Sequence, residues 1–231
     1  MFFFDPLYLI IAMPALLLAL YAQAKVKSAY AKYLRVPNMR NISGEETARH
    51  LLAANGLSFV NVEGIPGELT DHYDPRSKTL RLSAGVARSR SVAAVGIVAH
   101  EVGHAVQDAT AYTPLRLRAG LVPAVNLGSW LGPIVFLVGL FLQSPNLAWL
   151  GVFLFGGTAI FALVTLPVEL DASRRAMKML KSNGLVGVQD SKGANAVLRA
   201  AALTYVAALA QALSTLLYYG MLASGMGRSR D

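Results

Sequence analysis

The residues best suited to chemistry are the pentapeptide His100-Glu101-Val102-Gly103-His104. On a helix, residues four apart share a face, so the two imidazoles can reach one metal ion. The Glu101 carboxylate lies beside them, where it can polarise a metal-bound water and pass the proton to a leaving amine. This pattern is typical of zinc-dependent peptide hydrolysis. It predicts one Zn²⁺ per chain, with His100 and His104 as ligands and Glu101 as the catalytic acid-base group.

Catalytic zinc normally takes three protein ligands and leaves a fourth position open. Asp108 lies one turn beyond His104, but residues 100, 104 and 108 would span about 12 Å along a helix. Because one ion cannot gather all three, we expect Asp108 to support the site or to lie at the surface. Glu169 and Asp171 begin a helix two membrane crossings after His104, on the same side. A carboxylate from a second helix completes His-His-Glu sites, so we expect Glu169 to be the third ligand in preference to Asp171.

The other two histidines are weaker candidates. His50 lies in a segment with its own apolar face, and a structural or surface role is expected. His72 lies on a predicted strand before the motif helix. It could face the cleft and help to polarise a substrate carbonyl, although a plain exposed histidine is the ordinary interpretation.

The elements that position these residues belong to a membrane protein. Hydrophobic residues make up 55% of the 231 residues and charged residues 15%, against roughly 45–50% and 25% in soluble domains. The absence of cysteine excludes disulfides and thiolate chemistry. Four apolar runs can each cross a hydrocarbon layer about 30 Å thick: residues 7–23, 121–142, 147–168 and about 200–223.

The basic residues indicate an orientation rather than a nucleic-acid partner. The net charge is +8, and 19 of the 21 Lys and Arg residues lie in residues 24–120 and 167–199. This is the positive-inside pattern of membrane proteins. We therefore expect both segments in the cytoplasm, four spans, and both termini outside. The first apolar run has no preceding basic residues, so it is expected to be a retained anchor rather than a signal peptide.

The water-facing part of the chain contains clear local signals. Ser43 and Glu46 form a capping box for a helix that Gly56 ends. Residues 59–63 and 79–83 are predicted strands, and the turn at 74–77 predicts a hairpin of residues 69–73 with 79–83. Ser91 is a plausible N-cap for a motif helix over residues 92–109.

The fold class predicted from these elements is mainly α, a polytopic helical membrane protein with a small α+β zincin-like segment. The expected parts are an N-terminal anchor (1–24), a cytoplasmic metalloprotease segment (25–120), a transmembrane hairpin (121–168), a cytoplasmic helix with the third zinc ligand (169–199), and a fourth span with a short tail (200–231).

Long motifs give the chain a family resemblance over nearly its whole length. Residues 71–83, 91–108 and 166–176 resemble the bacterial neutral zinc metallopeptidases of YugP type. The chain is more distantly similar to HtpX heat-shock proteases and CAAX prenyl proteases. These share a hairpin before an H-E-x-x-H helix, then a transmembrane pair and a Glu-bearing helix. The resemblance implies a multi-pass protease of the bacterial cytoplasmic (inner) membrane.

The resemblance also bears on the support of the zinc ligands. In the distant relatives the third-ligand helix reads roughly E-x-E-A-D, and the final Asp supports a zinc histidine. Matched residue by residue, Glu169 takes the ligand place and Ser173 stands where that Asp would be. Asp171 or Asp108 is then the alternative support.

The sequence thus predicts a gluzincin-like, membrane-embedded zinc metalloendopeptidase with its active site on the cytoplasmic side. Its expected partners are the lipid bilayer and a peptide or membrane-protein substrate, with no nucleic acid. The strand edge near Leu80–Ser83 could pair with an extended substrate. The alternative is a non-catalytic membrane scaffold or partner-binding protein with a structural zinc site. Glu101 favours the enzyme, because a purely structural site needs no acid between its histidines.

Overall fold

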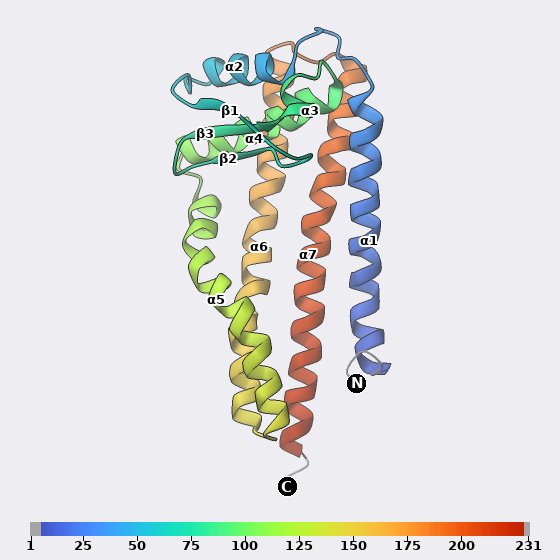
Figure 1. Ribbon diagram of the computed structural model, residues 1–231, viewed down its shortest axis with the longest axis vertical. Helices are drawn as coiled ribbons and strands as arrows, with labels where there is room; N and C mark the ends of the chain where they lie inside the picture. Colours follow the sequence, from blue (N-terminus) through green and yellow to red (C-terminus); the bar gives the residue numbers. More distant parts are fainter. Residues whose placement is uncertain (1–5, 229–231) are drawn as a thin grey trace. The chain divides into compact units, whose positions relative to one another are not determined.

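The computed structural model describes residues 6–228, and the first five residues of the expected anchor and the end of the expected tail lie outside this range. The described residues are mainly helical with one small sheet, which confirms the predicted fold class (Figure 1). The elements are α1 (Pro6–Leu34), α2 (Gly44–Ala54), β1 (Asn61–Ile65), β2 (His72–Asp74), β3 (Thr79–Ser83), α3 (Ala84–Ala87), α4 (Val92–Ala109), α5 (Thr113–Phe141), α6 (Pro145–Ser182) and α7 (Val188–Arg228).

The chain divides into two compact units. Of the described residues, the helical unit comprises 6–22, 116–167 and 204–228, and the mixed unit comprises 23–115 and 168–203. The mixed unit contains the whole sheet, α2, α3 and α4. It also contains every residue that the sequence singled out for chemistry.

Among the described residues, four helices are long and apolar enough to cross a membrane, as predicted: α1, α5, α6 and α7. Their bounds differ from the apolar runs. Helix α6 continues through Pro167 to Ser182, and α7 already begins at Val188. The segment expected as one separate helix over residues 169–199 is therefore the end of α6, a short link and the start of α7. The link contains Gly184, whose φ of 62° is suited to the end of a helix, as expected.

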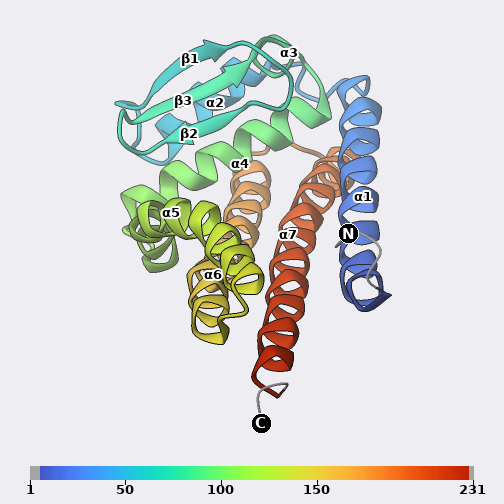
Figure 2. The same ribbon diagram turned by 60° about the horizontal axis from the view of Figure 1, so that its bottom comes forward.

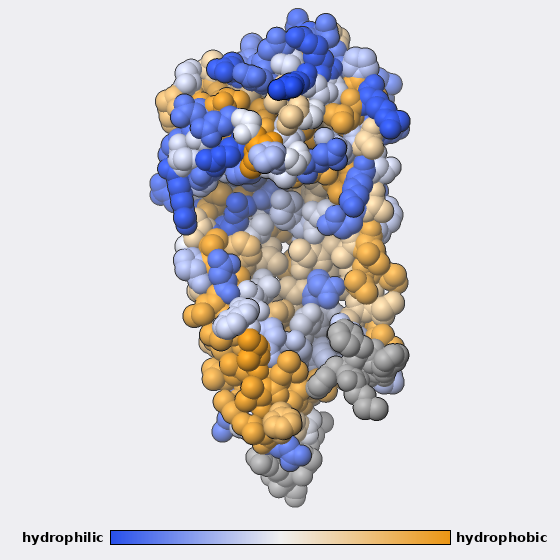
Figure 3. All heavy atoms as spheres, viewed as in Figure 1, coloured by the Kyte–Doolittle hydropathy of each residue, from blue (hydrophilic) through white to orange (hydrophobic). Residues whose placement is uncertain are grey.

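Small residues allow α5 and α6 to pack closely within the helical unit. A Cβ added to Gly139 would lie 2.3 Å from the Ala148 backbone nitrogen, and one added to Gly128 would lie 2.5 Å from the Leu154 carbonyl oxygen. Close backbone approach at small residues is a common way for helices to associate in lipid. On the face shown in Figure 3, apolar side chains gather over the lower part of this hairpin.

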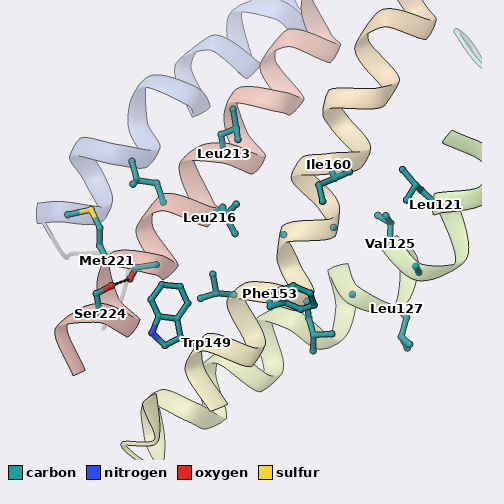
Figure 4. Close-up of a pocket in the computed structure, with 18 of the residues that line it drawn as sticks. Leu121, Val125, Leu127, Trp149, Phe153, Ile160, Leu213, Leu216, Met221 and Ser224 are labelled. Carbon is teal, nitrogen blue, oxygen red and sulfur yellow. Dashed lines mark hydrogen bonds between the residues drawn. The ribbon is translucent and has the colours of Figure 1, made fainter. Parts of the chain in front are cut away.

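A large apolar cavity also lies in the helical unit. It has a volume of about 1230 Å³, and its lining side chains come from α5, α6 and α7 (Figure 4). Among the described residues that line it, none is Asp, Glu, His, Lys or Arg. Ser224 supplies a hydroxyl, but that group donates to the Gly220 carbonyl of its own helix. The cavity therefore offers no group for acid-base or metal chemistry.

The sheet of the mixed unit has the strand order β1-β3-β2. Strand β3 pairs antiparallel with β2, so a hairpin is present as predicted, but its first strand covers residues 72–74 instead of 69–73. Strand β3 also pairs parallel with β1, which covers residues 61–65 instead of the predicted 59–63. Leu80 and Leu82 of β3 are fully buried in one core with Val95 and Val98 of α4. The hydrophobic side of the sheet therefore fixes the hairpin to the helix that carries the motif.

The suggested substrate-pairing edge at Leu80–Ser83 is wrong, because β3 is the central strand. Strand β1 pairs with one side of residues 79–83. On the other side, β2 pairs with residues 79–81 and the Ser83 amide donates to Asp71 Oδ1 at 2.7 Å. The edge strands are β1 and β2. Of these, β2 lies beside α4.

The helices of the mixed unit begin where their caps predict. The Ser43 side chain accepts from the Glu46 amide, and the Glu46 carboxylate accepts from the Ser43 amide, so the capping box is present. The Ser91 hydroxyl accepts from the Ala94 amide at the start of α4. Helix α4 spans the predicted residues, and most of its side chains are buried.

Candidate metal centre

Two helices bring three potential metal ligands together. Helix α4 carries His100 and His104, and α6 carries Glu169; one ligand atom from each lies within 4.8 Å of the others. Glu169 Oε2 is 3.2 Å from His100 Nε2 and 3.4 Å from His104 Nε2. Figure 2 shows α4 lying between the sheet and the part of α6 after Pro167. The three residues that the sequence selected as ligands thus converge.

A glycine within the motif permits this convergence. A Cβ added to Gly103 would lie only 2.7 Å from the Ala172 carbonyl oxygen, closer than real Cβ atoms come. Glycine in a helix interior costs about 1 kcal/mol relative to alanine, so such a residue points to a close backbone approach. Gly103 was given no role in the sequence analysis. Its role is to let α6 pass beside the two histidines.

The Nδ1 atom of each histidine has a partner on the protein side. His100 Nδ1 lies 3.1 Å from the Ser173 hydroxyl, and His104 Nδ1 lies 3.0 Å from Gln107 Oε1. Both Nε2 atoms are therefore left to face Glu169. Ser173, which replaces the aspartate of distant relatives, contacts a histidine after all, but through a hydroxyl.

Gln107 is a residue of the site that the sequence analysis missed. Its side chain is fully buried, and its Nε2 donates to the Val168 carbonyl at 2.8 Å and to Asp171 Oδ2 at 2.9 Å. The available signal was an amide one turn beyond His104, on the same buried side of α4. Only its contacts with the second helix show what this amide does.

Asp171 does not join the ligand cluster. Its carboxylate accepts from Gln107 and from Arg175 Nε, at 2.5 Å, and lies 3.8 Å from Arg174. These contacts neutralise the charge and orient the carboxylate toward the amide of Gln107. Asp171 therefore contacts Gln107, and Gln107 in turn contacts His104.

Glu101 is buried next to the cluster without belonging to it. Its side chain is 9% exposed, and its Oε2 accepts from the Tyr73 amide of β2 at 3.0 Å. Burial raises the pKa of Glu101, and the neighbouring His100 and His104 counteract part of that effect. The Tyr73 amide thus holds one oxygen of the Glu101 carboxyl group, and burial makes this group bind a proton more tightly.

The electrostatic environment favours a positive charge at the cluster. Burial alone would lower the pKa of His104, but its hydrogen bond with Glu169 and the nearby Glu101 carboxylate outweigh this and raise it. The cluster thus stabilises a cation among its side chains. A metal ion would supply that charge and displace the proton.

Asp108 and Tyr73 connect α4 to the hairpin instead of binding a histidine. Asp108 Oδ2 accepts from the Tyr73 hydroxyl at 2.7 Å and from Lys78 Nζ at 2.5 Å. Burial and the Asp108 carboxylate raise the pKa of Tyr73, so the phenol stays neutral. Because Glu101 binds the backbone of Tyr73 and Asp108 binds its side chain, this one residue holds β2 along two turns of α4.

The structure does not bring the remaining histidines to the cluster. His72 is the neighbour of Tyr73 on β2, so its side chain points to the opposite face of the strand. It lies across from Arg81, and its Nδ1 is 2.8 Å from the Thr70 carbonyl oxygen. His50 is exposed on α2. Neither histidine belongs to the ligand cluster.

The residues present fit a zinc ion. Two imidazole nitrogens and one carboxylate oxygen form the ligand set of His₂Glu zinc enzymes, which leaves a fourth position open. His100 and His104 each offer Nε2 with a hydrogen-bonded Nδ1, the arrangement that orients a metal-binding imidazole. Glu169 is 4% exposed, so its carboxylate is well shielded from competing water.

Comparisons with known proteins agree with this chemistry. The chain matches the family described as "Putative neutral zinc metallopeptidase" over residues 8–224. "Putative membrane protease YugP" of Bacillus subtilis (strain 168) is 45% identical over 216 residues, which cover 94% of this chain and 96% of the relative. No solved structure matches the chain at a significant level. The matched region contains α4 and α6 in full.

Proposed function

Since the chain belongs to the neutral zinc metallopeptidase family, we propose that it is a zinc endopeptidase of the His-His-Glu type acting on membrane-associated proteins. The observation that carries this proposal is the convergence of His100, His104 and Glu169, with ligand atoms within 4.8 Å, beside the buried Glu101. This arrangement supports hydrolysis better than a purely structural metal site.

In this proposal, Nε2 of each histidine and a Glu169 oxygen hold one zinc ion per chain. When bound, zinc supplies a Lewis acid that polarises the scissile carbonyl and makes water a stronger acid. Ser173 and Gln107 keep the two imidazoles oriented through their Nδ1 atoms.

Glu101 is the proposed general base and then general acid. The Tyr73 amide holds its Oε2, which leaves Oε1 for the attacking water. Glu101 takes one proton from this water as the oxygen adds to the peptide carbon. It then gives the proton to the peptide nitrogen as the C–N bond breaks. The raised pKa of Glu101 suits the first step, because the carboxylate must accept a proton from water, and the neutral acid then donates that proton to the peptide nitrogen.

The proposed substrate is an extended segment beside β2. An edge strand supplies backbone hydrogen bonds with little demand on sequence. Strand β2 has this position, because β3 occupies only one of its sides and α4 lies beside it. Glu101 already holds the Tyr73 amide, so a substrate would pair with the other backbone groups of this edge. The four candidate spans favour substrates in or near the bilayer. The similarity to a Bacillus subtilis protein favours the bacterial cytoplasmic membrane. The distribution of basic residues favours a site on the cytoplasmic side.

The rival is a scaffold that holds structural zinc and cleaves nothing. Structural zinc sites are usually closed by four protein ligands, whereas this cluster supplies three. A proteome comparison separates the two proposals. Membrane fractions from cells that make the wild-type chain or the Glu101→Gln variant are compared by mass spectrometry. We expect intact substrates to accumulate with Glu101→Gln. Identical membrane proteomes at equal protein levels would favour the scaffold.

A further inference from the structure

We propose that Gln107 is a positioning residue that fixes the tautomer of His104 and couples the two ligand helices, and that it thereby sets the affinity for zinc. The inference rests on the proposed function, because it assigns a role at the same metal site. Gln107 is fully buried, and both its side-chain oxygen and its nitrogen have partners.

The first step is the orientation of the amide. The Val168 carbonyl oxygen can only accept a hydrogen bond, so the group that faces it at 2.8 Å must be the Gln107 nitrogen. The second hydrogen of that nitrogen points to Asp171 Oδ2 at 2.9 Å, which is again an acceptor. The amide has no freedom to flip. Its oxygen must therefore face His104 Nδ1.

The second step is the tautomer of the histidine. An amide oxygen can only accept, so the contact of 3.0 Å requires the hydrogen on Nδ1 of His104. In the neutral imidazole, Nε2 then carries the lone pair. This nitrogen faces Glu169 at 3.4 Å. Gln107 thus selects the one neutral form of His104 that can bind a metal at the cluster.

The third step concerns the two helices. The acceptors of the Gln107 amide, Val168 and Asp171, lie on either side of Glu169 in α6. Arg175 in turn holds Asp171 at 2.5 Å. One side chain of α4 therefore binds the histidine on its own helix and the residues that flank the carboxylate ligand on the other. Its loss would leave buried polar groups unpaired at both helices.

The contact at the other histidine differs in kind. The Ser173 hydroxyl can donate or accept, so its 3.1 Å contact does not fix the tautomer of His100. The inference therefore predicts that the two histidines differ: Gln107 fixes the metal-binding tautomer of His104, whereas Ser173 does not fix that of His100.

The test measures the Zn²⁺ affinity of the purified full-length chain in detergent by competition with a chromophoric chelator. Gln107→Met keeps the length of the side chain but removes both kinds of hydrogen bond. Because loss of an outer partner of a metal ligand typically costs 10–100-fold in affinity, we expect weakening of about that size. The matched control is Gln189→Met on exposed α7 surface, which should leave the affinity unchanged.

A second pair of variants keeps the test decisive should Gln107→Met fail to fold. Gln107→Glu retains an acceptor for His104 but sets a negative charge against Asp171 and the Val168 carbonyl. Adding Asp171→Asn supplies a donor again. We expect the double variant to bind Zn²⁺ more tightly than Gln107→Glu alone. If Gln107 only filled space, the added Asp171→Asn change would not restore affinity.

The outcomes separate this inference from the proposed function. Wild-type affinity in folded Gln107→Met, or no difference between Gln107→Glu and the double variant, would overturn the role of Gln107. A wild-type chain that binds no Zn²⁺, or His104→Ala binding it as tightly as the wild type, would instead contradict the proposed metal site.

Discussion

Gly103 of α4 lies directly against the backbone of Ala172 in α6, with no room for a side chain between them. A Cβ at Gly103 would be 2.7 Å from the Ala172 carbonyl oxygen. Gly103 precedes His104, and Ala172 lies one turn beyond Glu169. The distance between the two histidines and the Glu169 carboxylate thus depends on residue 103 having no side chain.

This contact predicts the effect of Gly103→Ala. Alanine is the better helix former by about 1 kcal/mol, yet its methyl group would push α6 away and carry Glu169 with it. We expect loss of most bound zinc, measured as metal per purified chain, and loss of proteolysis. Gly120→Ala is the matched control, because a Cβ at this helical glycine of α5 meets nothing within 4 Å. Full zinc content in Gly103→Ala would contradict the account.

The choice of acid on α6 is tested by two single variants. Glu169→Ala removes the carboxylate that faces both Nε2 atoms and should lose most zinc and all activity. Asp171→Ala removes a partner of Gln107, Arg175 and Arg174 but no ligand atom, so a smaller loss of zinc is expected. A chain that is metal-free with Asp171→Ala but fully loaded with Glu169→Ala would show that the assignment is reversed.

Tyr73→Phe tests the connection between α4 and β2. The variant keeps the amide that holds Glu101 but loses the hydroxyl bond to Asp108. Loss of one such bond should lower the free energy of unfolding by about 1 kcal/mol. Because no ligand atom is touched, zinc content should not change, and thermal unfolding with metal analysis measures both. Reduced zinc in a folded Tyr73→Phe chain would show that the hairpin also supports the ligands.

The membrane orientation can be tested with single cysteines, since the chain has none of its own. Asn146→Cys at the start of α6 should react with an impermeant thiol reagent added to intact cells. Ser77→Cys and Asn183→Cys should stay unlabelled until the membrane is opened, because the basic segments that contain them are expected in the cytoplasm. The reverse labelling pattern would invert the proposed topology.

Local signals in the sequence predicted the elements well because those signals act locally. Ser91 caps α4 with its own hydroxyl, and Ser43 and Glu46 cap α2 through each other. The four apolar helices likewise follow from composition and length alone. Each of these features needs only residues that are close in the chain.

The contacts that were missed depend on residues far apart in the chain. Gln107 meets Val168 and Asp171 more than 60 residues later, and nothing near Gln107 indicates them. The pairing of β1 with β3 was missed because a parallel partner is not set by a tight turn. The same pairing places β3 in the centre of the sheet, which made Leu80–Ser83 the wrong edge for substrate.

The central claim is that Glu101 performs catalysis while His100, His104 and Glu169 hold the metal. Zinc per chain and cleavage are measured together on purified wild type and Glu101→Gln, with a membrane protein from the proteome comparison as substrate. We predict equal zinc, near one ion per chain, and a loss of cleavage of about 10²–10⁴-fold, the usual contribution of general acid-base catalysis. Equal zinc with undiminished cleavage would contradict the account.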